Sequence, residues 1–500
     1  MFKEINMSNI KIGWGEVSLV PHGRKVNLSG QFYERITDKV ETPIAVTALA
    51  IECGDDSVIF CSCDLVHAGE KVLAEARKKL SDTDIPLDKI ILSVIHTHTS
   101  LDFENCADSV GGSTLDVLAK LLPDAKYETL VSYNGDDLLA GKEAFDFVTD
   151  KIAEAVKLAW NDRREGMYAQ GFGRAAVGMC RRVCYDDGSA KMWGDTDMAN
   201  FTELEGGNDS GIELLFTFDT DKKLTGVVAN VACPSQVLEH RSFISSDYFG
   251  KLKGLLREKY GEDINLLALV SAAGDQCPRD MVRWVEPEAP INDPNIVRNE
   301  PTVRKADPSM FDIKGCERIA RRIATEVFYA YDEIDEYISD TELVHKNLTL
   351  DMPLRKVTIA EKDAAVKVIE EFKKQLGDGY ITFNDNARMH VFAGTVARYE
   401  AQQTVDIIPI EVHVLKLGNI AFATNPYELF LDYGNRIRAR SKASQTFLIQ
   451  LSCGAWGYLP TEKAEKGSHY SAYISSGTVG HAGGDLLVRK TVAEINEMWK

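Results

Sequence analysis

Short apolar runs alternate with amphipathic segments along most of the chain. Apolar runs bounded by turn residues predict strands, whereas apolar positions three or four residues apart predict helices. In Glu143–Asn161, for example, Phe147, Ile152 and Val156 recur near helical spacing while charged residues occupy the other face. The predicted strands are Ile44–Glu52, Ser57–Cys63, Lys89–Ile95, Ile212–Phe218, Gly226–Ala232, Asn265–Ser271, Ile407–Leu417, Asn419–Thr424 and Thr446–Leu451. The predicted helices are Glu70–Leu80, Glu143–Asn161, Tyr248–Lys259, Gly315–Asp335, Ala360–Leu376, Ala387–Gln403, Tyr427–Arg440 and Gly484–Trp499. This alternation predicts an α/β protein with mixed β-sheets flanked by helices.

No linker rich in Gly, Ser or Pro divides the chain, so we expect a single large domain over residues 1–500, with a possible subdivision near residue 340. The least regular stretch, Val285–Pro308, contains five prolines and predicts a long surface loop.

Composition narrows the possible partners. The 500 residues include 57 Lys and Arg against 76 Asp and Glu, a formal charge of −19. Such a charge argues against nucleic acid and anionic membranes as partners. The N-terminal residues do not resemble a secretory signal, and no apolar window approaches the ~18 residues of a membrane span. We therefore expect a cytoplasmic protein that does not insert into membranes and keeps most of its ten cysteines reduced. The oligomeric state stays open, and a homo-oligomer is possible.

The tripeptide His96-Thr97-His98 follows the predicted strand Lys89–Ile95. We expect the two imidazoles on opposite faces, so that one binds a metal and the other faces another part of the pocket. The competing interpretation is a strand end with two solvated polar residues. His67 and His240 are further polar candidates near predicted strand ends.

Other reactive residues occur where predicted strands end. Cys233 precedes a proline directly after Gly226–Ala232, and Asp275 and Cys277 lie in a tight turn after Asn265–Ser271. Glu428 falls in the first turn of the predicted helix Tyr427–Arg440, where a carboxylate is favoured even without a ligand.

These segments, in their order along the chain, resemble the catalytic domain of the neutral ceramidases, a family of zinc-dependent amidases. Ile95-His96-Thr97-His98-Thr99 is similar to the Thr-His-Thr-His-Ser segment of that family, and Tyr427-Glu428-Leu429 to its Gly-Glu-Phe segment. Gly457-Tyr458-Leu459-Pro460-Thr461, with Tyr470 twelve residues after Tyr458, resembles its Gly-Tyr-Val-Thr-Thr segment and second tyrosine. The turn from Gly274 to Arg279 resembles its Gly-Asp-Val-Ser-Pro-Asn turn.

The resemblance implies roles for individual residues. His96, Glu428 and Tyr458 would bind zinc, and His98 would contact substrate or transfer a proton. The second zinc histidine of the family lies fourteen residues before the Asp of Ile-Ser-Ser-Asp; counting back from Asp247 reaches Cys233, and a thiolate can bind zinc. Cys277 stands at the position of the active-site serine. The resemblance covers only the catalytic domain of the family. We therefore expect residues 1–500 to contain no counterpart of the C-terminal β-domain of secreted ceramidases.

We therefore expect a zinc hydrolase that cleaves an amide of a small or medium-sized soluble substrate through a metal-activated water. In this interpretation His98 acts as general acid and Tyr470 donates a hydrogen bond to the developing oxyanion. Asp275 either orients a ligand or holds the turn. Arg181, Arg182 and His469 are assigned to substrate binding, although an exposed ion pair is the commoner use of an arginine pair.

Two alternatives remain open at this point. In the first, Cys233 or Cys277 acts as a nucleophile beside zinc and supports ester or glycoside cleavage. In the second, the chain is a non-catalytic binding protein with a degenerate hydrolase site. Retention of His96, Glu428, Tyr458 and Tyr470 argues against the second alternative.

Overall fold

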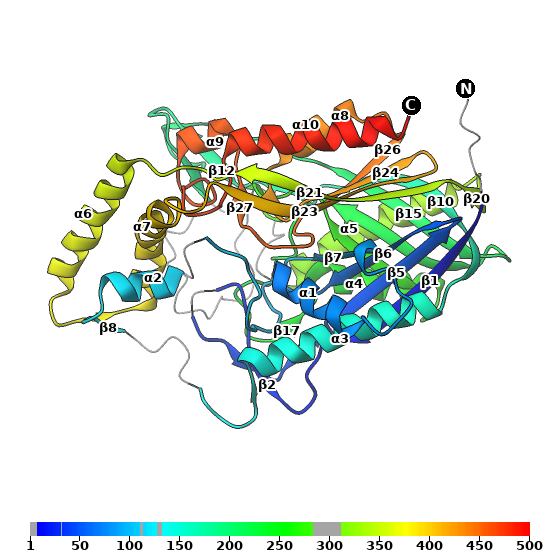
Figure 1. Cartoon of the computed structure of the whole chain (residues 1–500), viewed down its shortest axis with the longest axis horizontal. Coiled ribbons are helices and arrows are strands. Elements are labelled where there is room, and N and C mark those ends of the chain that lie inside the picture. The colour runs from blue at the N-terminus through cyan, green and yellow to red at the C-terminus, as the bar shows by residue number, and fades with distance from the viewer. Residues whose placement is uncertain (1–7, 32, 111–113, 128–132, 284–311) are drawn as a thin grey trace.

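The computed structural model describes residues 8–31, 33–110, 114–127, 133–283 and 312–500 (Figure 1). The predicted loop Val285–Pro308 lies outside these residues. Mixed sheets carry helices on their outer faces, which confirms the predicted α/β class. Among the described residues, no helix is both long enough and apolar enough to cross a membrane.

The largest sheet described has nine strands and mixes parallel and antiparallel pairs. It curls so strongly that the strands at its two ends, β18 and β7, contact each other. Its members, in spatial order, are β18 (Asn265–Val270), β16 (Leu224–Val231), β15 (Gly211–Asp219), β10 (Arg164–Arg174), β1 (Ser8–Ser18), β5 (Ala45–Cys53), β6 (Asp56–Cys63) and β7 (Ile90–Val94), with β20 (Asp340–Thr341) beside β1.

Strand β1 lies in the middle of this sheet although two glycines interrupt its apolar alternation. It pairs with β5 in antiparallel register from Ile10 opposite Cys53 to Ser18 opposite Ala45. The glycines are required because α3 (Gly141–Asn161) packs directly on the strand. A Cβ atom at Gly13 would collide with the carbonyl oxygen of Ala159 in that helix.

A second sheet packs against the first and contains only residues after position 340. Its order is β21 (Leu343–Pro353), β23 (Ile407–Leu417), β24 (Ile420–Thr424) and β26 (Gln445–Ile449). Helices α8 (Leu431–Arg440) and α10 (His481–Glu497) cover its outer face (Figure 1). Apolar side chains of both sheets, such as Phe60 and Phe422, meet in one buried cluster. The chain thus passes from one sheet to the other between β20 and β21.

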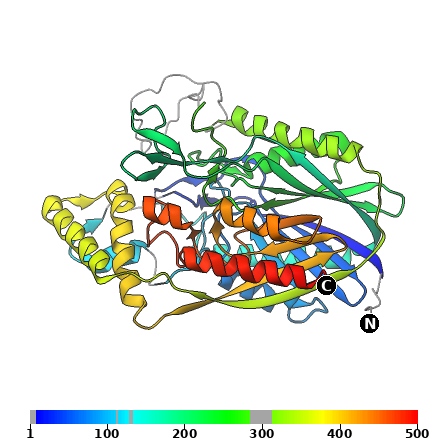
Figure 2. The ribbon, with the colours of Figure 1, turned by 90° about the horizontal axis from the view of Figure 1, so that it is seen from above.

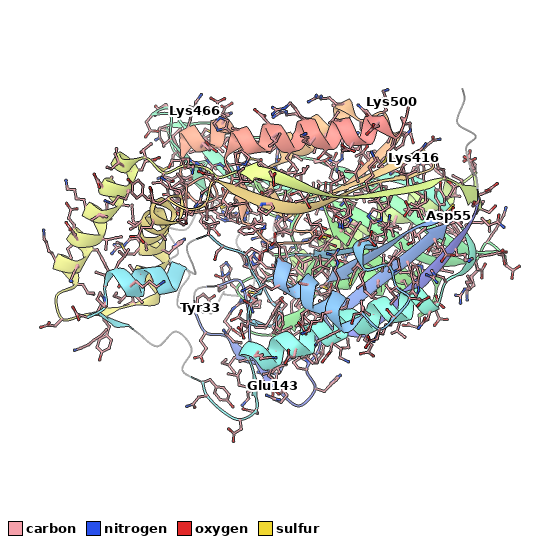
Figure 3. The ribbon with its side chains drawn as sticks, in the orientation of Figure 1. Tyr33, Asp55, Glu143, Lys416, Lys466 and Lys500 are labelled. Carbon is pink, nitrogen blue, oxygen red and sulfur yellow. The ribbon has the colours of Figure 1, made fainter. Side chains whose placement is uncertain are left out.

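Helices on the outer surface complete these layers, and side chains fill the space between them (Figure 3). Helix α1 (Glu70–Lys79) packs on α3, and α4 (Asp247–Tyr260) packs on α5 (Ile313–Asp332). Short strands form smaller sheets of two or three strands beside these layers. They are β2 (Lys25–Asn27), β3 (Ile36–Thr37), β4 (Val40–Thr42), β9 (Leu138–Leu139), β11 (Met179–Cys180), β12 (Arg182–Tyr185), β13 (Ala190–Met192), β14 (Phe201–Leu204), β17 (Ile244–Ser245), β19 (Gln276–Cys277), β25 (Glu428–Leu429) and β27 (Tyr458–Leu459).

A helical lobe projects from the layers on the left of Figures 1 and 2. It combines α2 (Thr114–Leu121) with α6 (Ile359–Leu376) and α7 (Phe383–Ala401), which share a separate apolar core. The short strands β8 (Lys126–Tyr127) and β22 (Tyr380–Ile381) join its two chain segments. Helices α6 and α7 both begin with a capping box, at Thr358 and Thr382.

Candidate metal centre and active site

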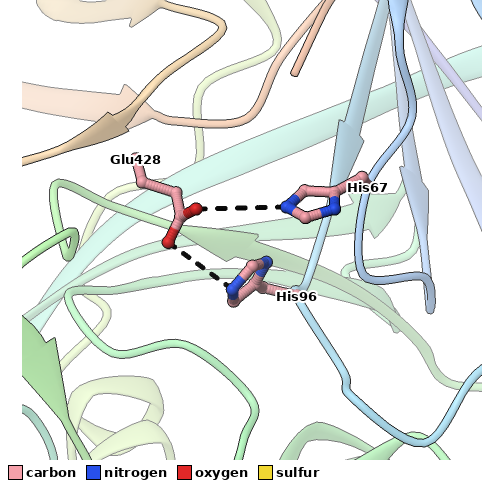
Figure 4. Close-up of side chains that lie close together, drawn as sticks. All are labelled: His67, His96 and Glu428. Atoms are coloured by element: carbon pink, nitrogen blue, oxygen red, sulfur yellow. Dashed lines mark ion pairs between the residues drawn. The ribbon is translucent and has the colours of Figure 1, made fainter. Parts of the chain in front are cut away.

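His67, His96 and Glu428 bring their ligand atoms together at one end of the two sheets (Figure 4). His96 Nε2 lies 3.6 Å from one carboxylate oxygen of Glu428, and His67 Nε2 lies 4.0 Å from the other. The three ligand atoms all lie within 4.8 Å of one another. His67 follows β6 and His96 follows β7. Because these strands are parallel neighbours, their carboxyl ends, and so the two histidines, meet at the same edge of the sheet.

The hydrogen bonds of His96 leave one ring nitrogen available to a metal. Its Nδ1 lies 2.9 Å from the carbonyl oxygen of Val66, which can only accept, so Nδ1 carries the proton. Burial lowers the pKa of His96 to about 4, which keeps the ring neutral. Nε2 therefore presents a lone pair toward Glu428.

The two histidines of the tripeptide do not lie on opposite faces of a strand, and that expectation was wrong. Strand β7 ends at Val94, and His96 adopts a left-handed backbone conformation with φ of 64°. The expectation also misapplied the period of a strand, because side chains alternate with a period of two and residues i and i+2 share one face. The rings of His96 and His98 lie edge to face with centroids 4.8 Å apart, and their Nε2 atoms are 3.2 Å apart.

Glu428 lies in a short strand rather than in the first turn of a helix. Strand β25 (Glu428–Leu429) pairs in parallel with β27 (Tyr458–Leu459), and α8 begins only at Leu431. The predicted helix start was wrong because the apolar pattern of Tyr427–Phe430 fits both a buried strand and a helix. Although burial raises it, the neighbouring His96 and His67 bring the pKa of Glu428 down to about 2, so the carboxylate is ionised.

These donors fit a zinc ion. Two imidazoles, an ionised carboxylate and the nearby phenol of Tyr458 are nitrogen and oxygen ligands of the kind that Zn²⁺ binds in hydrolases. Burial, together with the Glu428 carboxylate, raises the pKa of Tyr458 well above its usual value. A bound cation would remove that penalty, because it stabilises the phenolate.

Cys233 stands outside this group of ligand atoms. Its buried thiol lies 3.6 Å from the carbonyl oxygen of Pro234, and burial and the neighbouring Cys277 raise its pKa. The structure brings His67 beside Glu428 instead, a residue that the sequence marked only as a polar candidate. The role of Cys233 as a ligand stays a prediction.

Cys277 and Asp275 are buried and hold the turn between β18 and β19. The thiol of Cys277 contacts the carbonyl oxygen of Arg279, and burial raises its pKa to about 12. Asp275 accepts a hydrogen bond from the backbone N–H of Leu431 at 2.9 Å, at the start of α8. Burial raises the pKa of Asp275 to about 6. This hydrogen bond ties the turn to the start of α8, and the choice between ligand contact and a structural role for Asp275 stays a prediction.

Arg181 lies beside the candidate ligands Glu428 and Tyr458, with its side chain buried. It donates to the hydroxyl of Tyr458 at 3.3 Å, to the carbonyl of Gly274 at 3.1 Å and to Gln236 at 3.2 Å. The guanidinium also lies over the ring of Trp193. Arg181 thus places a positive charge next to the carboxylate and phenol of the site.

Arg182 points away from Arg181 and binds the loop that carries Tyr470. Its fully buried guanidinium forks onto Glu205 at 2.7 and 3.0 Å. It also donates to the carbonyl oxygens of Ser468 and Tyr470 at 2.8 and 3.0 Å. These contacts occupy its donors within the protein, so its expected role in substrate binding finds no support in the geometry.

The loop around Tyr470 has an unusual backbone. Ser468, His469 and Ser471 all have positive φ, at 61°, 75° and 72°. Such conformations are costly for residues with side chains and persist only where the surroundings enforce them. His469 accepts a hydrogen bond from the N–H of Met192 at 3.1 Å, whereas Tyr470 is 37% exposed and packs edge to face on Tyr458 at 5.5 Å. Tyr470 is therefore the member of this loop that can reach a substrate.

Sequence reasoning missed Glu239, a buried carboxylate that lies 4.0 Å from His98 Nδ1 and 3.0 Å from His240. An acidic residue directly before His240 was the available signal.

A second group of metal-type side chains has different partners. Glu411, His413 and Cys453 also lie within 4.8 Å of one another. Here, however, Arg77 forks onto Glu411 at 2.5 and 2.8 Å, and His413 bonds both Glu411 and His345 at 2.8 Å. A metal would have to displace the guanidinium, so we assign this group to internal hydrogen bonding.

No protein-family model and no curated protein sequence matches the chain. Solved structures do. A neutral ceramidase from Pseudomonas aeruginosa is 15% identical with a TM-score of 0.66, and the match covers 98% of this chain and 75% of that one. A ceramidase complexed with C2 is 13% identical with a TM-score of 0.66, covering 98% and 76%. The chain therefore has the fold of the neutral ceramidases.

Proposed function

We propose that this protein is a zinc-dependent hydrolase that cleaves an amide bond of a small or medium-sized substrate. His67, His96, Glu428 and Tyr458 are the proposed ligands. The observation that carries the proposal is the convergence of two imidazoles and an ionised carboxylate within 4.8 Å, in the fold of proteins named ceramidases. The amide specificity is taken from the names of those neighbours.

The residues around the site suit amide hydrolysis. A bound zinc ion would supply a Lewis acid for the carbonyl and lower the pKa of a water. His98, whose Nε2 lies 3.2 Å from that of His96, is placed to move a proton to the leaving nitrogen. Tyr470 is exposed beside Tyr458 and can donate a hydrogen bond to the developing oxyanion. Arg181 orients Tyr458 through its hydrogen bond to the phenol oxygen.

The alternative with a cysteine nucleophile has less support. Reactive cysteines have lowered pKa values and partial exposure. Cys233 and Cys277 are both fully buried, and burial raises the pKa of each thiol. Neither cysteine belongs to the described cluster of His67, His96 and Glu428, so the geometry gives no support to a covalent step.

Elemental analysis and a substrate panel test the proposal together. We expect about one zinc ion per chain, loss of N-acyl amide hydrolysis on chelation, and recovery when zinc is restored. The Glu428→Gln variant should lose both zinc and activity, whereas Glu213→Gln, which changes a similarly buried carboxylate near the start of β15, should retain both. Absence of zinc from the wild type, together with no hydrolysis of any amide, would overturn the proposal.

A further inference from the structure

Glu239 is a buried carboxylate that lies behind His98. One of its oxygens is 4.0 Å from His98 Nδ1, and the other is 3.0 Å from His240 Nε2. Gln236 donates to the first oxygen at 2.8 Å. Although burial raises it, the two histidines bring the pKa of Glu239 down to about 2, so the group is an ionised acceptor.

Arg35 fixes the positions of Glu239 and His98 relative to each other by hydrogen bonds to their backbones. Its buried guanidinium donates to the carbonyl oxygen of Glu239 and to that of His98, both at 2.7 Å. Gly30 lies against the imidazole, where a Cβ would collide with Nδ1 and the neighbouring ring carbon. Segments more than 130 residues apart are thus fixed so that the carboxylate and the imidazole stay neighbours.

The proton positions follow from the partners of each nitrogen. His96 Nδ1 donates to Val66, so His96 Nε2 has only a lone pair. His98 Nε2, 3.2 Å away, must then carry the proton and donate to it. A neutral His98 consequently has a lone pair on Nδ1. That buried atom has no hydrogen-bond partner among the described residues, and it faces the carboxylate of Glu239.

The Nδ1–H tautomer of His98 gives both His98 Nδ1 and the Glu239 carboxylate a hydrogen-bond partner. With the proton on Nδ1, His98 donates to Glu239 once a small side-chain movement closes the 4.0 Å separation. The condition is that the lone pair of His96 Nε2 is engaged by a cation instead of by His98. Carboxylate–histidine pairs of this kind orient imidazoles at metal sites.

We propose that Glu239 is a positioning residue that selects the Nδ1–H tautomer of His98 and leaves the Nε2 lone pair free to accept a proton. This inference rests on the metal-dependent function proposed above. It couples zinc binding to the His98 tautomer, and by reciprocity the loss of Glu239 weakens zinc binding.

Three measurements test this role. Nitrogen-15 NMR of histidine-labelled wild type, with His98 assigned by comparison with His98→Gln, should show Nε2–H without zinc and Nδ1–H with zinc. In the Glu239→Gln variant the new amide N–H can donate to His98 Nδ1, so the variant favours the Nε2–H tautomer. Its zinc affinity, measured by competition with a chelator, should fall about 10- to 100-fold. Its kcat should fall by a similar factor while KM changes about twofold or less.

Controls separate positioning from general damage. Glu213→Gln, at a similarly buried carboxylate, should bind zinc as the wild type does. In a His98→Gln background the further change Glu239→Gln should leave kcat nearly unaltered, because the two residues act as one unit. If the His98 tautomer does not change on zinc binding, or if Glu239→Gln has wild-type zinc affinity, the inference about Glu239 is wrong while the proposed function stands. A wild type that binds no zinc would overturn the proposed function and this inference with it.

Discussion

Glu428 and Tyr458 lie directly opposite each other in the parallel pairing of β25 and β27. Two proposed ligands separated by thirty residues are therefore positioned by backbone hydrogen bonds rather than by side-chain contacts alone. Gly274 packs against the outer side of this pair and donates its N–H to the carbonyl of Leu429 at 2.8 Å.

This packing predicts the effect of a single methyl group. A Cβ atom at Gly274 would collide with the carbonyl oxygen of Glu428. We expect Gly274→Ala to displace β25, to destabilise the protein by about 1–3 kcal/mol, and to weaken zinc binding. Gly254→Ala is the matched control, since its Cβ would meet no atom within 4 Å. Chelator competition and urea unfolding measure both effects, and wild-type zinc affinity in Gly274→Ala would contradict the model of the site.

The choice between His67 and Cys233 as a ligand can be made by zinc stoichiometry. His67→Ala should lower zinc content well below one per chain, because the imidazole lies 4.0 Å from Glu428. Cys233→Ala should keep most of its zinc. His413→Ala removes a buried histidine from the second group and should change stability but not zinc content. The reverse result, loss of zinc only in Cys233→Ala, would restore the ligand set implied by the family resemblance.

Arg182 should act on catalysis through the loop that it holds. A lysine cannot fork onto Glu205 and also reach the carbonyls of Ser468 and Tyr470. We expect Arg182→Lys to lower kcat about 10-fold or more and to have a smaller effect when Tyr470 is already phenylalanine. Arg436→Lys, at an exposed pair with Asp485, is the control. Equal losses with and without the Tyr470 hydroxyl would show that Arg182 acts elsewhere.

Asp64 predicts how stability changes with pH. Burial raises its pKa to about 7, so the folded protein keeps a proton that the unfolded chain loses near pH 4. The resulting stabilisation is complete below about pH 4 and is lost as pH rises through about 7. The Asp64→Asn variant should therefore gain stability relative to wild type between pH 5 and pH 8 in urea unfolding. The exposed Asp55, labelled in Figure 3, gives the control Asp55→Asn, and parallel pH profiles for Asp64→Asn and wild type would refute the effect.

The sequence predicted the fold class and most buried elements because their apolar patterns are long and regular. Strand Ile407–Leu417 and helix Ala360–Leu376, for instance, match the structure closely. Strand β1 was missed, since its glycines serve contact with α3 rather than strand formation. A single sequence does not show which helix will need that space.

The site was predictable only in part, because its geometry also depends on packing partners that a single sequence does not show. His96 and Glu428 stood out by their position at strand ends, yet the left-handed turn at His96 and the pairing of Glu428 with Tyr458 depend on tertiary contacts. Glu239 and His67 acquire meaning only through neighbours distant in sequence. Residue type and spacing thus suggested the chemistry, and packing decided the partners.

Arg398 ties the helical lobe to the loop that carries Tyr470. Arg398 on α7 donates to the carbonyl oxygens of Ile474, Gly477 and Thr478, a few residues beyond Tyr470. It also donates to the carbonyl of Arg355, which in turn holds Ala472. A tilt of α7 must either break these bonds or carry the segment with it. We therefore expect substitutions in the separate core of the lobe to shift Tyr470 and, through it, to change the turnover of the proposed hydrolase from a distance.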